Sequence, residues 1–139
     1  MSPSRAPTVE QSVRAMYADY FACFQRGDAA ATAEYFVAPL LRVADGRPTV
    51  LAGPAAVREM LAAMTERLRA AGYESSRMAS LEVSVLDGTA ALARARGTRH
   101  DRAGAAYQEF DVLYTLVRPD DAGWRIAGLL SVGGTPGGR

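Results

Sequence analysis

Hydrophobic residues near the start of the chain recur every three to four positions, the spacing of the buried face of an amphipathic helix. Thr8 and Gln11 begin this stripe with the spacing of a capping box. Gly27 is expected to end the helix, and Asp28 to cap a second, shorter one over Ala29–Phe36. The stripe of the first helix consists of Val9, Val13, Met16, Tyr17, Tyr20 and Phe24.

A hairpin and a third helix are predicted after Pro39, which is expected to end the helical stretch. Strands over Leu40–Ala44 and Thr49–Ala52 flank Asp45-Gly46, a residue pair typical of hairpin turns. Gly53-Pro54 opens the third helix, because the missing N–H of proline costs no hydrogen bond in the first turn. The apolar stripe of this helix consists of Val57, Met60, Leu61, Met64 and Leu68.

After Gly72 the apolar period changes toward two, which indicates half-buried strands. Short turns separate four such segments, so neighbouring strands are expected to pair antiparallel. The element order predicts one α+β domain over residues 8–132, with three helices covering one face of an antiparallel sheet. Residues 1–7 and 133–139 are expected to be flexible termini. The four predicted strands are Met78–Leu86, Thr89–Thr98, Tyr107–Arg118 and Trp124–Val132.

Composition excludes several function classes. The chain has 139 residues, all 16 basic residues are arginine and the net charge is +1, so we expect neither a nucleic-acid nor a membrane partner. Cys23 and His100 are the single residues of their types, which excludes an intrachain disulfide and a zinc site built mainly from Cys and His. The sequence has no glycine-rich phosphate motif, no GxSxG elbow and no apolar signal core. We therefore expect a cytoplasmic protein that uses neither metal nor cofactor.

Four short segments follow one another along the chain: Gln25-Arg26-Gly27-Asp28, Tyr35-Phe36, Leu51-Ala52-Gly53 and Asp121–Ile126. In this order and spacing they resemble the NTF2-like or SnoaL-like family, an α+β cone with a cystatin-like fold. The resemblance runs from about Val9 to Val132. It implies a curved sheet around an apolar pocket, closed by the first helices, and a homodimer formed through the outer sheet face. It implies no single function, because this fold carries isomerases, hydrolases, cyclases, dehydratases and non-catalytic modules.

Tyr20 is the first candidate for chemistry. It lies eight residues before Asp28, a spacing similar to that of the tyrosine that donates to an oxyanion in ketosteroid isomerases of this fold. The alternative is a buried aromatic residue whose hydroxyl finds a backbone partner. The catalytic aspartate of those isomerases falls on Ala44 here, so steroid isomerisation by their route is not expected.

Asp111 is the candidate for proton transfer, since a carboxyl group in an apolar pocket would have a raised pKa. Strand alternation, however, puts Phe110, Val112 and Tyr114 on one face and Asp111 on the other. In the same hairpin Arg96 can lie opposite Asp111, and Thr98 opposite Glu109. The alternative is therefore a charge-paired outer face.

Arginines at two places in the chain could bind a carboxylate or a phosphate. The segment that contains Arg94, Arg96, Arg99 and Arg102 is more simply interpreted as a solvated hairpin. Arg42 is either a pocket cation or an outward residue of its strand, and the alternation favours the outward position.

The sequence thus predicts a pocket for a hydrophobic molecule, such as a polyketide- or terpenoid-like one. Any reaction would be a cofactor-independent isomerisation, cyclisation, dehydration or hydrolysis with Tyr20 and Asp111 as catalytic residues. The alternative is a non-catalytic ligand-binding or protein-interaction module. If the catalytic hypothesis is right, Tyr20 and Asp111 must reach the same cavity. The expected substrate-binding residues are Tyr17, Phe24, Met60, Met64, Arg96 and Tyr114.

Overall fold

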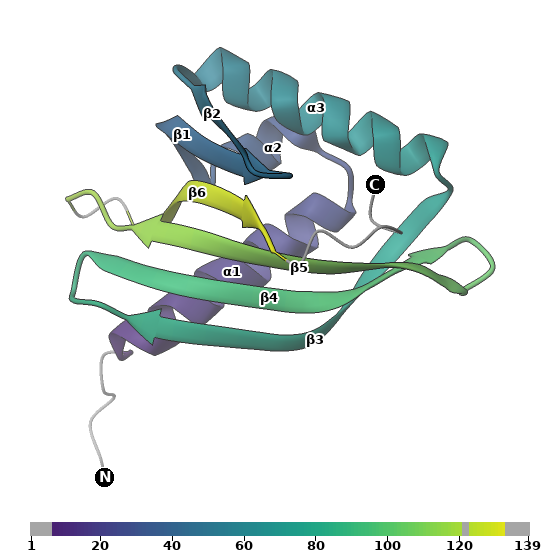
Figure 1. The fold of residues 1–139 in the computed structure, drawn as a ribbon. Coiled ribbons are helices and arrows are strands. Elements are labelled where there is room, and N and C mark those ends of the chain that lie inside the picture. The colour runs from purple at the N-terminus through teal and green to yellow at the C-terminus, as the bar shows by residue number, and fades with distance from the viewer. Residues whose placement is uncertain (1–6, 121–122, 133–139) are drawn as a thin grey trace, which may run out of the picture.

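The computed structural model describes residues 7–120 and 123–132. Residues 1–6 and 133–139 of the predicted flexible termini, and residues 121–122 of a predicted turn, lie outside the described residues. The element order is the predicted one: two helices, a hairpin, a third helix and four further strands. In Figure 1, α1 crosses one face of the sheet behind β3, β4 and β5, and α3 lies at the end formed by β1 and β2.

The three helices begin where the sequence predicts. In α1, Val9–Gln25, the Thr8 hydroxyl accepts from the backbone N–H of Gln11, and the Gln11 side chain accepts from the N–H of Thr8. The Asp28 side chain caps α2, Ala29–Ala33, which is shorter than predicted because the chain enters β1 at Phe36. The third helix, α3, spans Pro54–Ala70.

Six strands form one sheet in the order β2-β1-β6-β5-β4-β3. Neighbouring strands are antiparallel as expected, except that β1 and β6 run parallel. Eighty residues lie between these two strands in the sequence, so no local turn reveals their relative direction. The strands are β1 Phe36–Ala44, β2 Arg47–Leu51, β3 Tyr73–Val85, β4 Ala90–Asp101, β5 Ala106–Val117 and β6 Arg125–Ser131.

The first strand begins four residues earlier than predicted and contains Pro39, which was expected to end a helix. Its ladder with β6 shifts register between Phe36 and Leu41, where a residue without an N–H is tolerated. The turn to β2 is as predicted: Asp45 and Gly46 both have positive φ, 52° and 74°.

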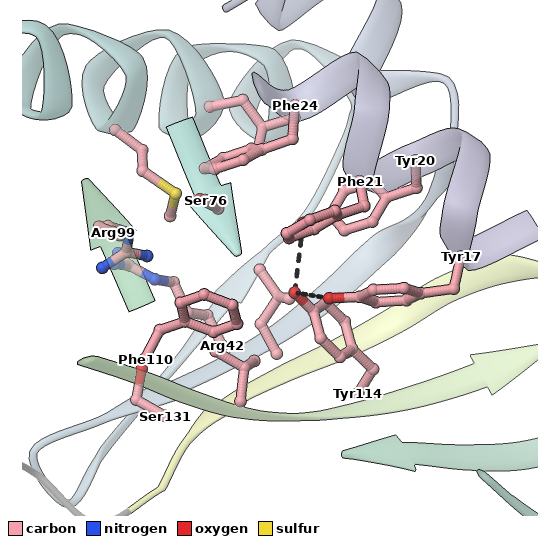
Figure 2. Close-up of a pocket in the computed structure, with 14 residues that line it drawn as sticks. Tyr17, Tyr20, Phe21, Phe24, Arg42, Ser76, Arg99, Phe110, Tyr114 and Ser131 are labelled. Carbon is pink, nitrogen blue, oxygen red and sulfur yellow. Dashed lines mark hydrogen bonds between the residues drawn. The ribbon is translucent and has the colours of Figure 1, made fainter. Parts of the chain in front are cut away.

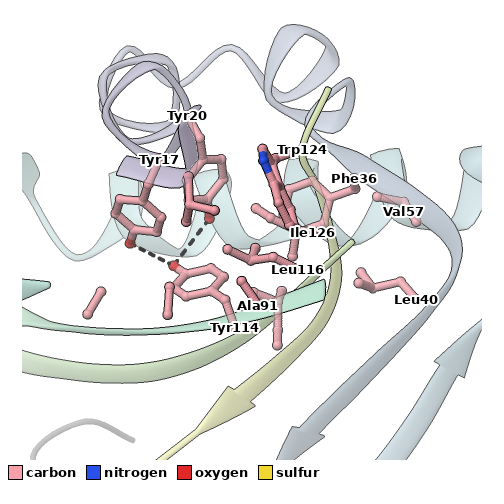
Figure 3. Close-up of a cluster of buried hydrophobic side chains, with 14 of the residues drawn as sticks. Tyr17, Tyr20, Phe36, Leu40, Val57, Ala91, Tyr114, Leu116, Trp124 and Ile126 are labelled. Atoms are coloured by element: carbon pink, nitrogen blue, oxygen red, sulfur yellow. Dashed lines mark hydrogen bonds between the residues drawn. The ribbon is translucent and has the colours of Figure 1, made fainter. Parts of the chain in front are cut away.

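The core lies between α1 and the sheet face that it covers, which we call the inner face (Figure 3). Ala91, Ala93 and Ala95 of β4 are at most 1% exposed, and their small side chains leave room for aromatic rings above them. Gly97 continues this row. A Cβ there would overlap the Arg77 carbonyl and come within 2.6 Å of the Phe110 ring. The small row on β4 thus lets Phe110 lie over the inner face beside α1.

Candidate ligand-binding site

A cavity of about 100 Å³ lies between α1, α3 and the inner face of the sheet (Figure 2). It reaches solvent beside Ser131, which is exposed. Half of its lining is apolar or aromatic and half carries a polar group. The apolar half comprises Phe21, Phe24, Leu61, Met64, Phe110, Val112 and Leu129, and the polar half Tyr17, Tyr20, Tyr114, Arg42, Arg99, Ser76 and Ser131.

Three tyrosines bring their hydroxyls together at one side of the cavity (Figures 2 and 3). Tyr17 and Tyr20 lie three residues apart on α1 and so share a helical face, while Tyr114 points up from β5. The Tyr17 hydroxyl donates to the Tyr114 hydroxyl at 3.1 Å, and the hydroxyls of Tyr20 and Tyr114 lie 3.5 Å apart. We call these residues the tyrosine cluster. All three are 2–6% exposed.

Burial determines the protonation of the tyrosine cluster. It raises the pKa of Tyr17, Tyr20 and Tyr114 above the usual value for a phenol, so all three hydroxyls stay protonated at neutral pH. The Tyr114 oxygen accepts a hydrogen bond from the Tyr17 hydroxyl. A phenol that accepts a hydrogen bond becomes a better hydrogen-bond donor itself. The Tyr114 hydroxyl can therefore donate its own proton in a hydrogen bond to an oxygen atom in the cavity.

Two arginines from distant strands also line the cavity. Arg99 of β4 donates to the Gln108 side chain at 2.7 Å and lies 5.5 Å from the centre of the Phe110 ring, while its buried Nε has no partner. Arg42 of β1 has the same parity as Leu40, whose side chain is fully buried. The predicted outward position of Arg42 is therefore wrong. Its neighbour Leu41 takes that place and is 40% exposed, so β1 carries apolar residues on both of its faces.

Asp111 does not lie in the cavity. Its strand pairs as predicted, with Arg96 opposite Asp111 and Thr98 opposite Glu109, but this row faces the opposite side of the sheet, which we call the outer face. There the Asp111 carboxylate accepts two hydrogen bonds from Arg94, at 3.0 and 2.8 Å, and lies 3.6 Å from Arg96. These hydrogen bonds hold the pKa of Asp111 below its usual value, the opposite of what an acid catalyst needs.

The structure therefore brings together only part of the predicted site. Tyr17, Tyr20, Phe24, Met64 and Tyr114 line one cavity. Asp111 and Arg96 lie on the outer face, so the predicted convergence of Tyr20 and Asp111 is not formed. Met60 packs against the core without lining the cavity.

Arg99 was not predicted as a cavity residue, because its neighbours in the sequence are charged. A detectable signal did exist: Ala91, Ala93, Ala95 and Gly97 alternate as small buried residues, and Arg99 has the same parity. His100 lies off the cavity in the β4–β5 hairpin, where its ring contacts the Thr98 hydroxyl at 2.8 Å and the Gly104 carbonyl at 3.1 Å.

Two further observations concern the part of the chain that the structure describes. It contains no group of three or more Cys, His, Asp or Glu residues that could hold a metal ion. It also contains no helix that is both long and apolar enough to span a membrane.

Comparison with known proteins assigns the family. The family model described as NTF2-like protein (DUF6841) matches residues 10–134, and the chain therefore belongs to this family of NTF2-like proteins. A search of curated proteins found no match.

Solved structures share the fold. An NTF2-like protein with a cystatin-like fold from Novosphingobium aromaticivorans has a TM-score of 0.70 and 22% identity, covering 91% of this chain and 84% of its own. An NTF-2 like protein of unknown function from Shewanella oneidensis has a TM-score of 0.69 and 16% identity, with coverages of 89% and 98%. Aln2 from a Streptomyces species has a TM-score of 0.68 and 25% identity, with 93% of both chains covered. The α+β cone expected from the sequence is confirmed.

Proposed function

We propose that the protein binds a small hydrophobic molecule in the cavity and that the tyrosine cluster donates a hydrogen bond to an oxygen atom of that molecule. The observation that carries this proposal is the convergence of three protonated, buried hydroxyls on a cavity with apolar and aromatic walls. Ligand sites commonly combine apolar walls with a few placed polar groups.

The size of the cavity limits the ligand. Drug-sized molecules occupy pockets of roughly 300–1,000 Å³, whereas this cavity measures about 100 Å³. Met64 and Phe24 lie on its wall and can change rotamer, but the site as formed suits a single-ring molecule better than a polyketide or a terpenoid.

The lining favours the non-catalytic form of this function. No Asp, Glu or His is among the described residues around the cavity, so this part of the lining supplies no ordinary general base. The predicted catalysis by Tyr20 together with Asp111 is not proposed, because Asp111 lies on the outer face.

The proposal is tested by the relative affinity of acetophenone and ethylbenzene, which differ by one carbonyl oxygen, in calorimetric titrations. We expect wild-type protein to prefer acetophenone, and Tyr114→Phe to reduce that preference about 3- to 10-fold, the value of one net hydrogen bond. Tyr35→Phe, at a half-buried tyrosine that does not line the cavity, is the control and should keep the preference. An unchanged preference in Tyr114→Phe would contradict the role of the cluster.

We also propose that the protein forms a homodimer through the outer face. Leu41 is 40% exposed and Val50, its partner across β1 and β2, is 64% exposed. Val43, Leu130 and Leu113 form the neighbouring apolar row over β1, β6 and β5. Arg94 and Asp111 on the same face give it both charges, so the face is complementary to a copy of itself.

Sedimentation analysis tests the dimer. We expect a dimer for the wild type and a monomer for Leu41→Arg, because the new charge would be buried at the contact. Leu86→Arg, at a 63% exposed residue outside the strands, should remain a dimer. A monomeric wild type at micromolar concentration would refute the proposal.

A further inference from the structure

Every side-chain group that the cavity wall offers for strong hydrogen bonding is a donor or can act as one. The tyrosine cluster supplies protonated hydroxyls, and Arg42 and Arg99 supply guanidinium groups. With two arginines and no acidic residue among the described lining, the wall carries two positive charges. A cavity with this lining attracts a ligand that can accept hydrogen bonds and carries negative charge.

The two arginines are not neutralised by the rest of the described chain. Ion pairs within residues 7–120 and 123–132 involve Arg14, Arg69, Arg94 and Arg96, and neither Arg42 nor Arg99 takes part in one. Arg94 shows the contrast, because it has a bidentate carboxylate partner on the outer face. Burying a guanidinium partly and without a counter-ion costs free energy, and a carboxylate that binds it offsets this cost.

Arg99 is held at the cavity wall, but its hydrogen-bonding capacity is not fully used. Its bond to Gln108 and its contact with the Phe110 ring use one end and one face of the guanidinium, while the buried Nε–H has no acceptor. Figure 2 shows Arg99 across the cavity from the hydroxyls of Tyr17 and Tyr114. Burial dominates the pKa of Tyr20 and Tyr114, but the charge of Arg99 lowers both, so its field extends to the tyrosine cluster.

We propose that the ligand of this cavity is a small aromatic or hydrophobic carboxylate, whose anionic group binds Arg42 and Arg99 and whose ring packs between Phe21, Phe24 and Phe110. This inference rests on the proposed ligand-binding function and specifies its ligand class. A planar carboxylate matches the fork of a guanidinium, and a single ring with one carboxylate is the size that the cavity accommodates.

Benzoate and benzamide test the proposal, because they have nearly the same shape and differ in charge. Titration followed by calorimetry should give an affinity for benzoate at least about tenfold higher than for benzamide, as one charge-assisted hydrogen bond requires. Arg42→Gln and Arg99→Gln should each weaken benzoate binding about tenfold or more and change benzamide binding less than about twofold. Arg77→Gln, an exposed outer-face arginine, should leave both affinities unchanged.

The possible results separate this inference from the function on which it rests. Equal affinities for benzoate and benzamide would overturn the carboxylate proposal while leaving a ligand-binding cavity. Binding of neither probe would also overturn it, and would count against the proposed function as well. An equal loss of benzoate affinity in Arg77→Gln would show general surface attraction and overturn the proposal. If the melting curve shows that Arg99→Gln does not fold, the benzoate and benzamide affinities of Arg42→Gln alone test the proposal.

Discussion

Removal of the Tyr114 hydroxyl should destabilise the fold more than removal of the Tyr17 hydroxyl. In Tyr114→Phe, the hydroxyl of Tyr17 loses its acceptor, and at 2% exposure this residue cannot turn to water. An orphaned buried hydroxyl costs about 1–3 kcal/mol. In Tyr17→Phe the Tyr114 oxygen keeps its neighbour Tyr20 at 3.5 Å, so we expect a loss of about 0.5–1.5 kcal/mol.

The double variant tests the coupling within the tyrosine cluster. Tyr17→Phe with Tyr114→Phe leaves no orphan from the 3.1 Å bond, so its cost should fall below the sum of the single costs by about 0.5–2 kcal/mol. Trp124, the single tryptophan and 3% exposed, reports urea unfolding by its fluorescence. At an m-value of about 2 kcal/mol per molar urea, a 2 kcal/mol loss lowers the midpoint by about 1 M. Additive costs, or a larger loss in Tyr17→Phe, would refute the hydrogen-bond assignment.

Three further predictions concern stability. Gly97→Ala should cost about 1–3 kcal/mol in urea unfolding, because its Cβ overlaps Phe110 and the Arg77 carbonyl, while Gly88→Ala, with open space around it, should cost far less. Burial raises the pKa of the tyrosine cluster in the folded state, so the protein should keep its full stability below pH ~10 and lose stability above it. The absorbance of tyrosinate should show these phenols titrating only as the protein unfolds. Because Arg94 lowers the pKa of folded Asp111, the stability from this carboxylate is present above its unfolded pKa, near 3.8, and is lost as pH falls; Asp111→Asn should make the acid side of the stability profile flatter, and an unchanged slope would count against the ion pair.

Local signals predicted most of the elements. The capping box at Thr8 and Gln11 and the turn at Asp45-Gly46 depend on residues close in sequence, and both formed as expected. The pairing of Arg96 with Asp111 followed from the length of one hairpin loop. Features of this kind require only short-range geometry, so a single sequence contains enough information to place them.

Features that depend on residues far apart in the sequence could not be predicted from local patterns. The parallel pairing of β1 with β6 depends on how α3 and the four strands between them return the chain, and no local pattern encodes it. Arg42 was misplaced because both faces of β1 bear apolar residues, so alternation alone could not identify the inner face. Arg99 was missed because a charged neighbourhood normally indicates solvent, whereas here the guanidinium packs on Phe110 at the cavity wall.

The most direct test of a ligand-binding cavity is to map benzoate onto the protein by ¹H–¹⁵N NMR titration. Our account predicts that saturable shift changes concentrate on the backbone amides of Tyr17, Phe21, Arg99 and Tyr114 around the cavity. Amides of outer-face residues remote from these should move little. Shifts confined to the outer face, or the absence of saturable shifts at millimolar benzoate, would contradict the claim that this cavity is the binding site.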